Sequence, residues 1–407
     1  MPATGPSVLI VLENLSVPGD RRVWQEARAL TEAGYAVSVV CPKSRGFENS
    51  HERLEGIEVY RYRALEGSGV LGYLVEYSWA FVNQFCLAVR VFLKTGFCVL
   101  HGCNPPDTIF LIGLFFRIFR VRFIFDQHDP APELCVSKFR RRGVFFRMSL
   151  WAEYLSFRSA SATLVTNDTA KEVALTRGHV PRERLFVVRG CPDLKDFQLH
   201  EPVTELKEER KNLVVYLGLM GPQDGVDLLI DSIDYLVKTK GRSDTLFVLI
   251  GFGPELARLQ AMVVSRDLEH CVRFTGALYG KRLRDYLATA DVAVSPDPSN
   301  GLNDRLTMMK IFEYMACGLP MVLFDLKEGR LSAGDGALYA RPNDTADFGE
   351  QITLLLDCQE LRLRLGAIGR GRACGELNWE WQKQSLLKAY DTLFQPAGDV
   401  SAFRRSA

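Results

Sequence analysis

The chain has 407 residues, more than one ordinary hydrophobic core holds, and this length predicts two α/β domains. A hydrophobic content of 47% supports sizeable buried cores, and a charged content of 24% is ordinary for a globular protein. Because 50 Lys and Arg residues balance 49 Asp and Glu residues, the global charge gives no support to a nucleic-acid-binding function.

The N-terminus and the cysteines predict a cytoplasmic protein. The ten cysteines form no CxxC pair and show no zinc spacing, which favours free thiols in a reducing compartment. The opening sequence MPATGPSVLIVLENL lacks a basic region ahead of a long apolar run, so we interpret it as a first strand rather than a signal peptide. No stretch reaches about 18 uninterrupted apolar residues, which argues against a transmembrane helix.

The N-terminal half shows the pattern of a Rossmann-like domain. Residues 7–13 form a short apolar run typical of a buried parallel strand, Val23, Ala27 and Leu30 recur at helical spacing, and residues 37–41 form a second strand. Strand, helix and strand within about 35 residues make a βαβ unit. Further strands are predicted at residues 57–62, 98–101, 122–126, 163–166 and 185–188.

The same plan restarts in the C-terminal half. A helix is predicted at residues 226–239, and strands are predicted at residues 212–217, 245–250, 272–275, 292–295 and 321–324. The charged segment 200–211 is poor in core residues and is predicted to be the linker. We therefore expect an N-terminal domain at residues 1–199 and a C-terminal domain at residues 212–375. Two such sheets facing each other put the carboxyl ends of their strands on a shared cleft.

The most informative segment is SPDPSNGLNDRLTMMKIFEYMACGLPMVLFD at residues 295–325. We expect Thr307 to cap a helix that carries Lys310 and Glu313 and ends at Gly318. A helix N-terminus offers free N–H groups and a positive dipole end, which suit a diphosphate, and Lys310 adds a full charge beside it. Glu313 lies one turn further on the same face and can accept both hydroxyls of a ribose.

This segment resembles the donor-binding motif of family 4 glycosyltransferases, and its KIFEYMACGLP core is close to a group that acts in bacterial polysaccharide assembly. The segments VPGDRRVWQEARALTEAGYAVSVVCP, NPPD, FDQHDPAPEL and SAGDGALYARPND also look like that group, so the resemblance extends over nearly the whole chain. It implies an α/β protein of the GT-B fold, with two Rossmann-like domains facing across a cleft. It also implies that a C-terminal helix at residues 376–395 crosses back to the first domain. The tail 396–407 is expected to be disordered.

The resemblance implies a retaining glycosyltransferase. Its donor would be a nucleotide diphosphate sugar, with a UDP-sugar favoured and a GDP-sugar as the alternative, and its acceptor a lipid-linked saccharide or similar molecule in glycan biosynthesis. No cofactor beyond this co-substrate is expected. The chain contains no well-placed DxD motif, which favours a mechanism without a metal.

The donor motif departs from the family pattern at several positions. Arg305 stands where the family has the first of two glutamates, and residues 306–308 replace a glycine-rich turn. Leu219 and Asp224 stand where the family has a phosphate-binding Arg and Lys. The donor-side candidates are Gly218, Gly221, Gly253, Asp297, Arg305, Thr307, Met308, Met309, Lys310 and Glu313.

His128 is the main candidate on the acceptor side, because it follows the strand predicted at residues 122–126. Asp126 and Asp129 could hold its ring in one tautomer. The resemblance makes His128 the catalytic-region histidine, together with Lys310 and Glu313 as catalytic candidates, while a structural loop histidine is the alternative. The other acceptor-side candidates are Asp20, Arg21, Asn104, Asp107 and Asp129.

Basic and aromatic residues alternate through residues 115–151. The basic residues are Arg117, Arg120, Arg122, Lys138, Arg140, Arg141, Arg142 and Arg147, and the aromatic residues include Phe115, Phe116, Phe119, Phe139, Phe145, Phe146 and Trp151. This pattern suits the inner surface of an anionic membrane, with the apolar segment 70–93 beside it, and peripheral attachment there would favour a polyprenyl-diphosphate-linked acceptor. A hydrophobic core with a solvated basic rim explains the pattern equally well.

The sequence leaves two alternative functions. A nicotinamide-dependent enzyme needs a GxGxxG turn after the first strand, and ENLSVPGD does not supply one. A non-catalytic subunit of a glycan synthesis complex is favoured by Arg305 and Leu219, whereas the pair Lys310 and Glu313 and the presence of His128 argue against it.

Overall fold

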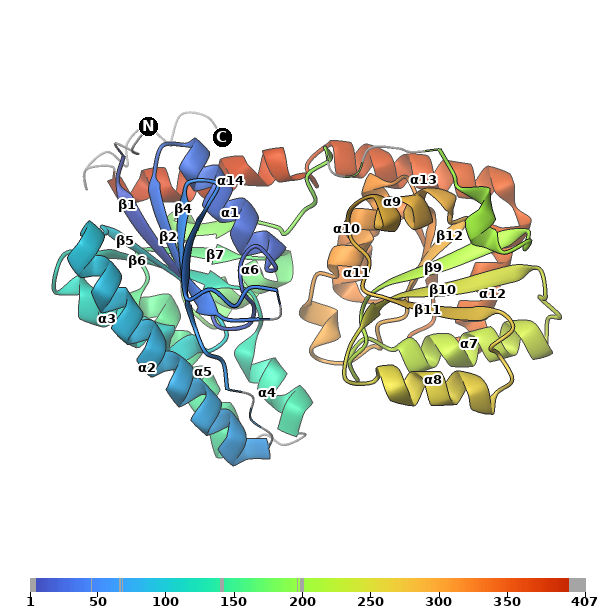
Figure 1. Cartoon of the computed structure of the whole chain (residues 1–407), viewed down its shortest axis with the longest axis horizontal. Coiled ribbons are helices and arrows are strands. Elements are labelled where there is room, and N and C mark those ends of the chain that lie inside the picture. The colour runs from blue at the N-terminus through green and yellow to red at the C-terminus, as the bar shows by residue number, and fades with distance from the viewer. Residues whose placement is uncertain are drawn as a thin grey trace. The chain divides into compact units, whose positions relative to one another are not determined.

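The computed structural model describes residues 5–44, 46–65, 67, 69–139, 143–195, 197 and 201–394. The chain forms two compact units: an N-terminal unit of Met1–Gly190 with Gln382–Ala407, and a C-terminal unit of Cys191–Trp381 (Figure 1). Each unit is a twisted, mainly parallel sheet covered by helices. The expected α/β architecture with two parallel-sheet domains is confirmed, and the tail expected to be disordered lies outside the described residues.

The N-terminal unit is built on an eight-stranded sheet in the order β3-β4-β2-β1-β5-β6-β7-β8. Only the pair of β3 and β4 is antiparallel among the described strands. The strands are β1 (Ser7–Val11), β2 (Ala36–Pro42), β3 (His51–Leu54), β4 (Ile57–Tyr62), β5 (Val99–Cys103), β6 (Arg122–Gln127), β7 (Ala162–Val165) and β8 (Leu185–Val187). The helices are α1 (Arg21–Glu32), α2 (Gly69–Thr95), α3 (Phe110–Arg117), α4 (Ala131–Phe139), α5 (Val144–Ser159) and α6 (Asp168–Thr176), with short 3-10 turns at Asp107–Ile109 and Arg182–Arg184.

The C-terminal unit has a six-stranded sheet in the order β11-β10-β9-β12-β13-β14, in which every pairing is parallel. Its strands are β9 (Asn212–Leu219), β10 (Thr245–Phe252), β11 (Val272–Gly276), β12 (Val292–Ser295), β13 (Met321–Phe324) and β14 (Ala337–Ala340). Its helices are α7 (Val226–Lys238), α8 (Leu256–Ser265), α9 (Gly280–Thr289), α10 (Met309–Ala316), α11 (Lys327–Ala333), α12 (Thr345–Asp357) and α13 (Gln359–Cys374), with 3-10 turns at Thr204–Lys207, Asn303–Arg305 and Gly334–Gly336.

Successive residues of β9 show why these strands are continuously apolar. Val214 and Tyr216 pack with α7, α8 and α12 on one face of the sheet, whereas Leu213 and Val215 pack with α9 and α10 on the other (Figure 1). A parallel strand between two helical layers buries both faces, so it loses the alternation of a half-exposed strand. The carboxyl ends of the strands and the N-termini of the following helices then lie at one edge of the sheet, where ligands bind in such folds.

The last helix, α14 (Trp379–Phe394), belongs from Gln382 onward to the N-terminal unit. Tyr390 is buried there against Tyr35, with ring centroids 5.4 Å apart in an edge-to-face contact. The guanidinium of Arg122 lies 4.9 Å from the centroid of the Phe394 ring, and Lys383 pairs with Glu32. The implied return of the C-terminal helix to the first domain is confirmed.

The polar segment expected as the linker is bonded to the C-terminal unit. The Lys207 ammonium lies 2.7 Å from a carboxylate oxygen of Asp291, and the Val203 N–H donates to the Thr289 hydroxyl at 2.9 Å. The chain instead passes between the units at residues 190–191 and 381–382. The charge and the lack of core residues suggested a linker, but charged residues of this segment have partners on the C-terminal unit.

Candidate active site

The segment singled out in the C-terminal half leads from β12 through a loop into α10. The helix begins at Met309 with Met308 at the N-cap position, and no side chain caps it with a hydrogen bond. The expectation that Thr307 caps the helix is wrong, because α10 starts one residue too late for that hydroxyl to stand at the N-cap. The first N–H groups of α10 thus lack the side-chain acceptor that caps most helices, which leaves them available to an anion.

Lys310 lies in the first turn of α10 and is 7% exposed. Its Nζ is 2.9 Å from Oδ1 and 3.2 Å from Oδ2 of the buried Asp297, and 4.8 Å from the centroid of the Tyr216 ring. Burial lowers the pKa of Lys310, but the charges of Asp297 and Asp224 outweigh burial and raise this pKa above its usual value. Lys310 is therefore a charged ammonium held in one place.

Three glycines let the backbone of neighbouring turns approach closely beside Lys310. A Cβ on Gly251 would lie 1.8 Å from the carbonyl oxygen of Gly218, and a Cβ on Gly253 would lie 2.4 Å from that of Met220. A Cβ on Gly218 would lie 3.2 Å from Cε of Lys310. The ends of β9 and β10 thus need glycine, and they form one wall beside the Lys310 side chain.

The loops around Lys310 are tied to each other. The Gly221 N–H donates to Asp224 Oδ2 at 2.8 Å, and the Asn303 side-chain amide donates to the carbonyl oxygens of Gln223 and Pro298, both at 2.9 Å. The donor-side candidates Gly218 and Asp297 therefore lie next to Lys310, and Gly221 binds Asp224, whose charge acts on Lys310.

The remaining donor-side candidates flank this group along the chain. Glu313 is buried one turn after Lys310, and Arg305 ends the 3-10 turn that precedes α10. Thr307 and Met308 lie in the link between that turn and α10, and Met309 is exposed. Arg330, on α11, pairs with the carboxylate of Asp325 at 2.5 and 2.8 Å.

His128 follows β6 in the N-terminal unit, and its ring is oriented by Asp126. Nε2 of His128 lies 2.7 Å from Oδ2 of Asp126, whose Oδ1 accepts from Arg22 at 2.7 Å. Burial raises the pKa of Asp126, but the charges of Arg22 and His128 outweigh it and hold this pKa well below its usual value. Burial lowers the pKa of His128, yet the carboxylate of Asp126 raises it overall.

A buried network that the sequence analysis missed extends from Asp126. His101 Nε2 lies 3.4 Å from Asp126 Oδ2, and its Nδ1 lies 2.9 Å from the Tyr390 hydroxyl. Glu26, which is fully buried, lies 3.2 Å from Arg22. Burial raises the pKa of Glu26 to about 7. The i,i+4 spacing of Arg22 and Glu26 beside the apolar stripe of α1 was a usable signal for a buried pair, whereas nothing local pointed to Tyr390.

Asn104 connects His128 to the other acceptor-side candidates. Its side-chain oxygen accepts from the backbone N–H groups of His128 at 2.6 Å and Asp129 at 3.2 Å. Its amide donates to Asp107 Oδ1 at 2.6 Å and to the Asp129 carbonyl at 2.8 Å. Burial raises the pKa of Asp107 to about 8, with the Glu153 carboxylate adding to the effect. Asn104, Asp107, His128 and Asp129 therefore form one group.

Asp20 and Arg21 stand apart from that group in role. Asp20 is the N-cap of α1, and its carboxylate accepts from the Val23 N–H at 3.0 Å. Arg21 is exposed at the start of the same helix. Arg22, the next residue, is the one that reaches the buried carboxylates.

The side chains of His101, Cys103 and Asp126 are close enough to suggest a metal site, since their ligand atoms lie within 4.8 Å of one another. The surrounding charges do not fit a cation. Arg22 already forms an ion pair with Asp126, and burial raises the pKa of Cys103 well above its usual value, so its thiol keeps its proton. We assign His101 and Asp126 to the hydrogen-bonded network rather than to a metal site.

Comparison with solved structures identifies the fold. The structure of HepE from Anabaena in complex with UDP and glucose superposes with a TM-score of 0.74 at 15% sequence identity, covering 95% of this chain and all of that one (100%). Two parallel-sheet units with a helix returning to the first define the GT-B fold.

Family comparisons are consistent with this fold. The description "Glycosyl transferase 4-like domain" matches residues 19–191, and "Glycosyl transferases group 1" matches residues 211–358. The chain belongs to these family 4-type glycosyltransferases.

Two curated relatives illustrate the range of the family. The alpha-D-kanosaminyltransferase of Streptomyces kanamyceticus is 26% identical over 223 residues, which cover 53% of this chain and 56% of that protein. The O-antigen chain mannosyltransferase RfbU of Salmonella typhimurium is 24% identical over 272 residues, which cover 67% of this chain and 69% of that protein. This chain thus spans only about half the length of the first of these relatives.

Proposed function

We propose that this glycosyltransferase moves a sugar from a UDP-sugar to a lipid-linked saccharide acceptor in glycan biosynthesis, with retention of the anomeric configuration. The observation that carries the proposal is the position of Lys310 in the first turn of α10, whose N-terminus has no side-chain cap. The UDP in the HepE structure supports this base over guanine, and a GDP-sugar is the alternative donor.

Lys310 is suited to bind a diphosphate because it is charged before the ligand arrives. The carboxylate of Asp297 compensates the cost of burying the ammonium in the free protein. A diphosphate beside the N-terminus of α10 would share the Lys310 ammonium with Asp297. Its oxygens would also accept hydrogen bonds from the uncapped N–H groups of the helix. Glu313, one turn further along α10, is in the position to accept the ribose hydroxyls.

Lys310 and the N-terminus of α10 can also stabilise the diphosphate as it leaves the sugar. As the bond between sugar and diphosphate breaks, negative charge grows on the leaving phosphate, and a preorganised ammonium with helix N–H groups stabilises that charge. In the retaining mechanism that we propose, the departing phosphate accepts the proton of the attacking hydroxyl on the same face of the sugar. No step in this scheme requires a metal.

We assign His128 to the acceptor side. Its Nε2 is engaged by Asp126, which leaves Nδ1 to contact a substrate hydroxyl. Because the pKa of His128 is raised, the ring carries a positive charge over more of the neutral pH range than an ordinary histidine. We therefore propose that it binds and polarises substrate oxygens, rather than acting as the base.

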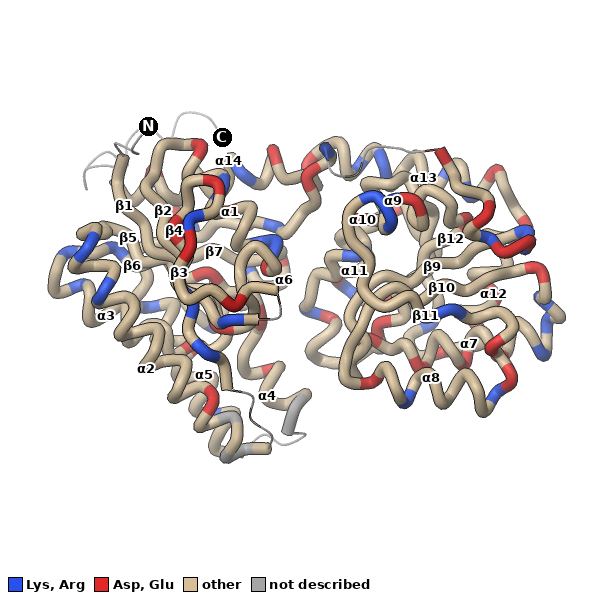
Figure 2. Tube along the Cα trace, viewed as in Figure 1, with Lys and Arg blue, Asp and Glu red and all other residues tan. Residues whose placement is uncertain are grey.

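The surface of the N-terminal unit supports a lipid-linked acceptor. Among the 27 residues of α2 only Glu76, Arg90 and Lys94 are charged, and Figure 2 shows the long uncharged stretch of this helix. Exposed apolar side chains gather on α2, α3 and α5, namely Leu74, Val75, Trp79, Val82, Leu93, Leu111, Leu114, Phe115, Val144, Phe145, Met148, Trp151 and Leu155. Surface patches of this kind mark interaction sites.

An apolar cavity of about 240 Å³ opens beside the acceptor-side group. It is lined by Leu74, Pro106, Asp107, Leu134 and Met148, among others. Part of a prenyl or acyl chain would fit there.

The aromatic pattern of residues 115–151 combines core and surface residues, because Phe116 is buried whereas Phe115 and Trp151 are exposed. The side chains of Lys138, Phe139 and Arg140–Arg142 lie outside the part that the structure describes. No helix in the described ranges has both the length and the apolar character needed to cross a bilayer.

Transfer can be tested directly. We expect the chain to release UDP from a UDP-sugar when a prenyl-diphosphate-linked saccharide is present, and we expect product NMR to show the donor's anomeric configuration. His128→Ala should lower the rate strongly while UDP binding is kept. Tight nucleotide binding without turnover for any sugar or acceptor would instead favour the non-catalytic subunit that Arg305 suggests.

A further inference from the structure

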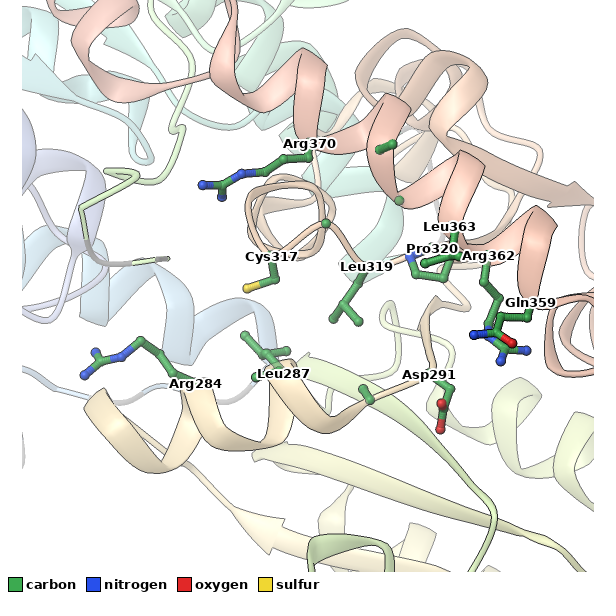
Figure 3. Close-up of a pocket in the computed structure, with 15 residues that line it drawn as sticks. Arg284, Leu287, Asp291, Cys317, Leu319, Pro320, Gln359, Arg362, Leu363 and Arg370 are labelled. Carbon is green, nitrogen blue, oxygen red and sulfur yellow. The ribbon is translucent and has the colours of Figure 1, made fainter. Parts of the chain in front are cut away.

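A cavity of about 480 Å³ lies at the amino-terminal edge of the C-terminal sheet (Figure 3). Its wall includes Asp291, which directly precedes β12, and Pro320, which directly precedes β13. The proposed donor residues Asp297 and Lys310 follow the carboxyl end of β12. Because these strands are parallel, the cavity and the donor site lie at opposite edges of one sheet.

Three arginines line this cavity: Arg284 on α9, and Arg362 and Arg370 on α13. Within the described part of the chain, none of them forms an ion pair with a carboxylate. Arg362 donates to the carbonyl oxygens of Leu355 and Leu356 at 2.7 and 2.8 Å, and Arg370 donates to that of Phe197 at 3.2 Å. These carbonyls orient two of the guanidiniums without neutralising them.

Arg284 is the least satisfied of the three. Its Nε is buried, and no acceptor among the described residues binds it. A guanidinium nitrogen that is shielded from water and lacks a partner is costly, and an anion would remove that cost.

The acidic residue of the cavity does not balance these arginines. One oxygen of the Asp291 carboxylate, Oδ2, lies 2.7 Å from Lys207 Nζ and also accepts from the Leu213 N–H at 2.7 Å. The negative charge of Asp291 is therefore neutralised by Lys207 and does not compensate the arginines. The cavity keeps an excess of positive charge at two places: Figure 3 shows Arg284 and Arg370 on the Cys317 side and Arg362 beside Gln359.

Apolar side chains separate the two cationic places. Leu287, Leu319 and Pro320 line the cavity between them (Figure 3). This arrangement suits a ligand with an uncharged carbon skeleton and a strongly anionic group. The volume lies within the range of sites that bind small molecules.

We propose that this cavity binds a small phosphorylated molecule, separately from the sugar donor. A phosphate monoester carries nearly two negative charges near neutral pH, which the two guanidiniums of Arg284 and Arg370 match better than they match the single charge of a carboxylate. The planar fork of arginine binds two phosphate oxygens at once, so these residues give geometric selectivity as well as charge. The proposal holds whether or not the donor is a UDP-sugar.

The test is calorimetric titration of the full chain with glucose 6-phosphate and with inorganic phosphate, using glucose as the uncharged control. Both phosphates should bind, the sugar phosphate more tightly, and glucose should not. Arg284→Gln should weaken binding of glucose 6-phosphate about tenfold or more. Arg282→Gln, an exposed arginine on the same helix that does not line the cavity, should leave binding unchanged.

A second variant separates the two sites. Lys310→Met should weaken UDP binding at least about tenfold but leave glucose 6-phosphate binding intact, and saturating UDP should not displace the sugar phosphate from the wild type. The proposal is overturned if neither phosphate binds at about 10 mM. It is also overturned if Arg284→Gln binds like Arg282→Gln, or if UDP competes with glucose 6-phosphate.

Discussion

The hydroxyl of Tyr390 lies 2.9 Å from Nδ1 of His101, joining residues 289 positions apart in the sequence. Both groups are buried, and His101 in turn contacts Asp126, which orients His128. The last helix of the chain is therefore bonded to the carboxylate that holds the proposed acceptor-side histidine.

Tyr390→Phe should destabilise the N-terminal unit by about 1–2 kcal/mol, because it leaves a buried histidine nitrogen without its partner. The decrease in the free energy of unfolding can be measured by urea unfolding, monitored with a spectroscopic probe in the N-terminal unit. Tyr35→Phe is the matched control, since Tyr35 packs on the same helix but is only partly buried. Equal stability of the two variants would show that the Tyr390 hydroxyl contributes nothing.

Asp126 should set the protonation of His128. In the wild type we expect NMR titration to give a His128 pKa above the usual value of about 6.5, and Asp126→Asn should lower it. Since the folded pKa is raised, the stability contributed by His128 is fully present below about pH 6.5 and is lost as the pH rises through the folded pKa. A His128 that titrates identically in both proteins would refute this role of Asp126.

Asp107 should make stability fall with rising pH. Its pKa is raised to about 8, so the folded state holds a proton that the unfolded state has lost between about pH 4 and 8. In that window the Asp107 carboxyl lowers the free energy of unfolding by up to about 1.4 kcal/mol for each unit by which the pH rises. Asp107→Asn should therefore flatten the pH dependence of the unfolding free energy. Glu183→Gln, at an exposed position of the same unit, should leave the wild-type slope, and a wild-type slope in Asp107→Asn would contradict the prediction.

The apolar surface of the N-terminal unit should bind lipid. Flotation with vesicles that contain anionic lipid should carry the wild type upward, and the double variant Trp79→Ser, Trp151→Ser should bind several-fold less, because both rings are exposed on that surface. Val264→Ser removes an exposed apolar side chain from the C-terminal unit and serves as the control. Failure of the wild type to float would favour a soluble acceptor.

Local sequence predicted those parts of the fold that local forces determine. The strands at Ile57–Tyr62, Val292–Ser295 and Met321–Phe324 were predicted with their observed bounds, because continuous apolar runs between turn residues mark buried parallel strands. β3 and β14 were missed. β3 is a short, charged edge strand, and β14 (ALYA) is an edge strand without a β-branched residue, so neither carries a clear strand signal.

The candidate site divides in the same way. The motif around Lys310 and Glu313 is contiguous, so the sequence alone was enough to predict it as a candidate site. Asp297, the ion-pair partner of Lys310, also lies within this motif. The prediction that Thr307 caps the helix was wrong, because the N-cap position depends on the backbone of the preceding loop. Arg22 and Glu26 are neighbours on α1, but His101 and Tyr390 reach them only through the sheet and the returning helix, and a single sequence contains no record of that contact.

The measurement that tests the central claim most directly is calorimetric titration with UDP and GDP of the wild type, Lys310→Met and Glu313→Gln. The exposed residues Lys281 and Glu360 provide matched controls, as Lys281→Met and Glu360→Gln. We predict that UDP binds the wild type and both controls with the same affinity, and that binding weakens at least about tenfold in each α10 variant. UDP binding that is unchanged in Lys310→Met and Glu313→Gln, or no binding of either nucleotide to the wild type, would contradict a donor site on α10.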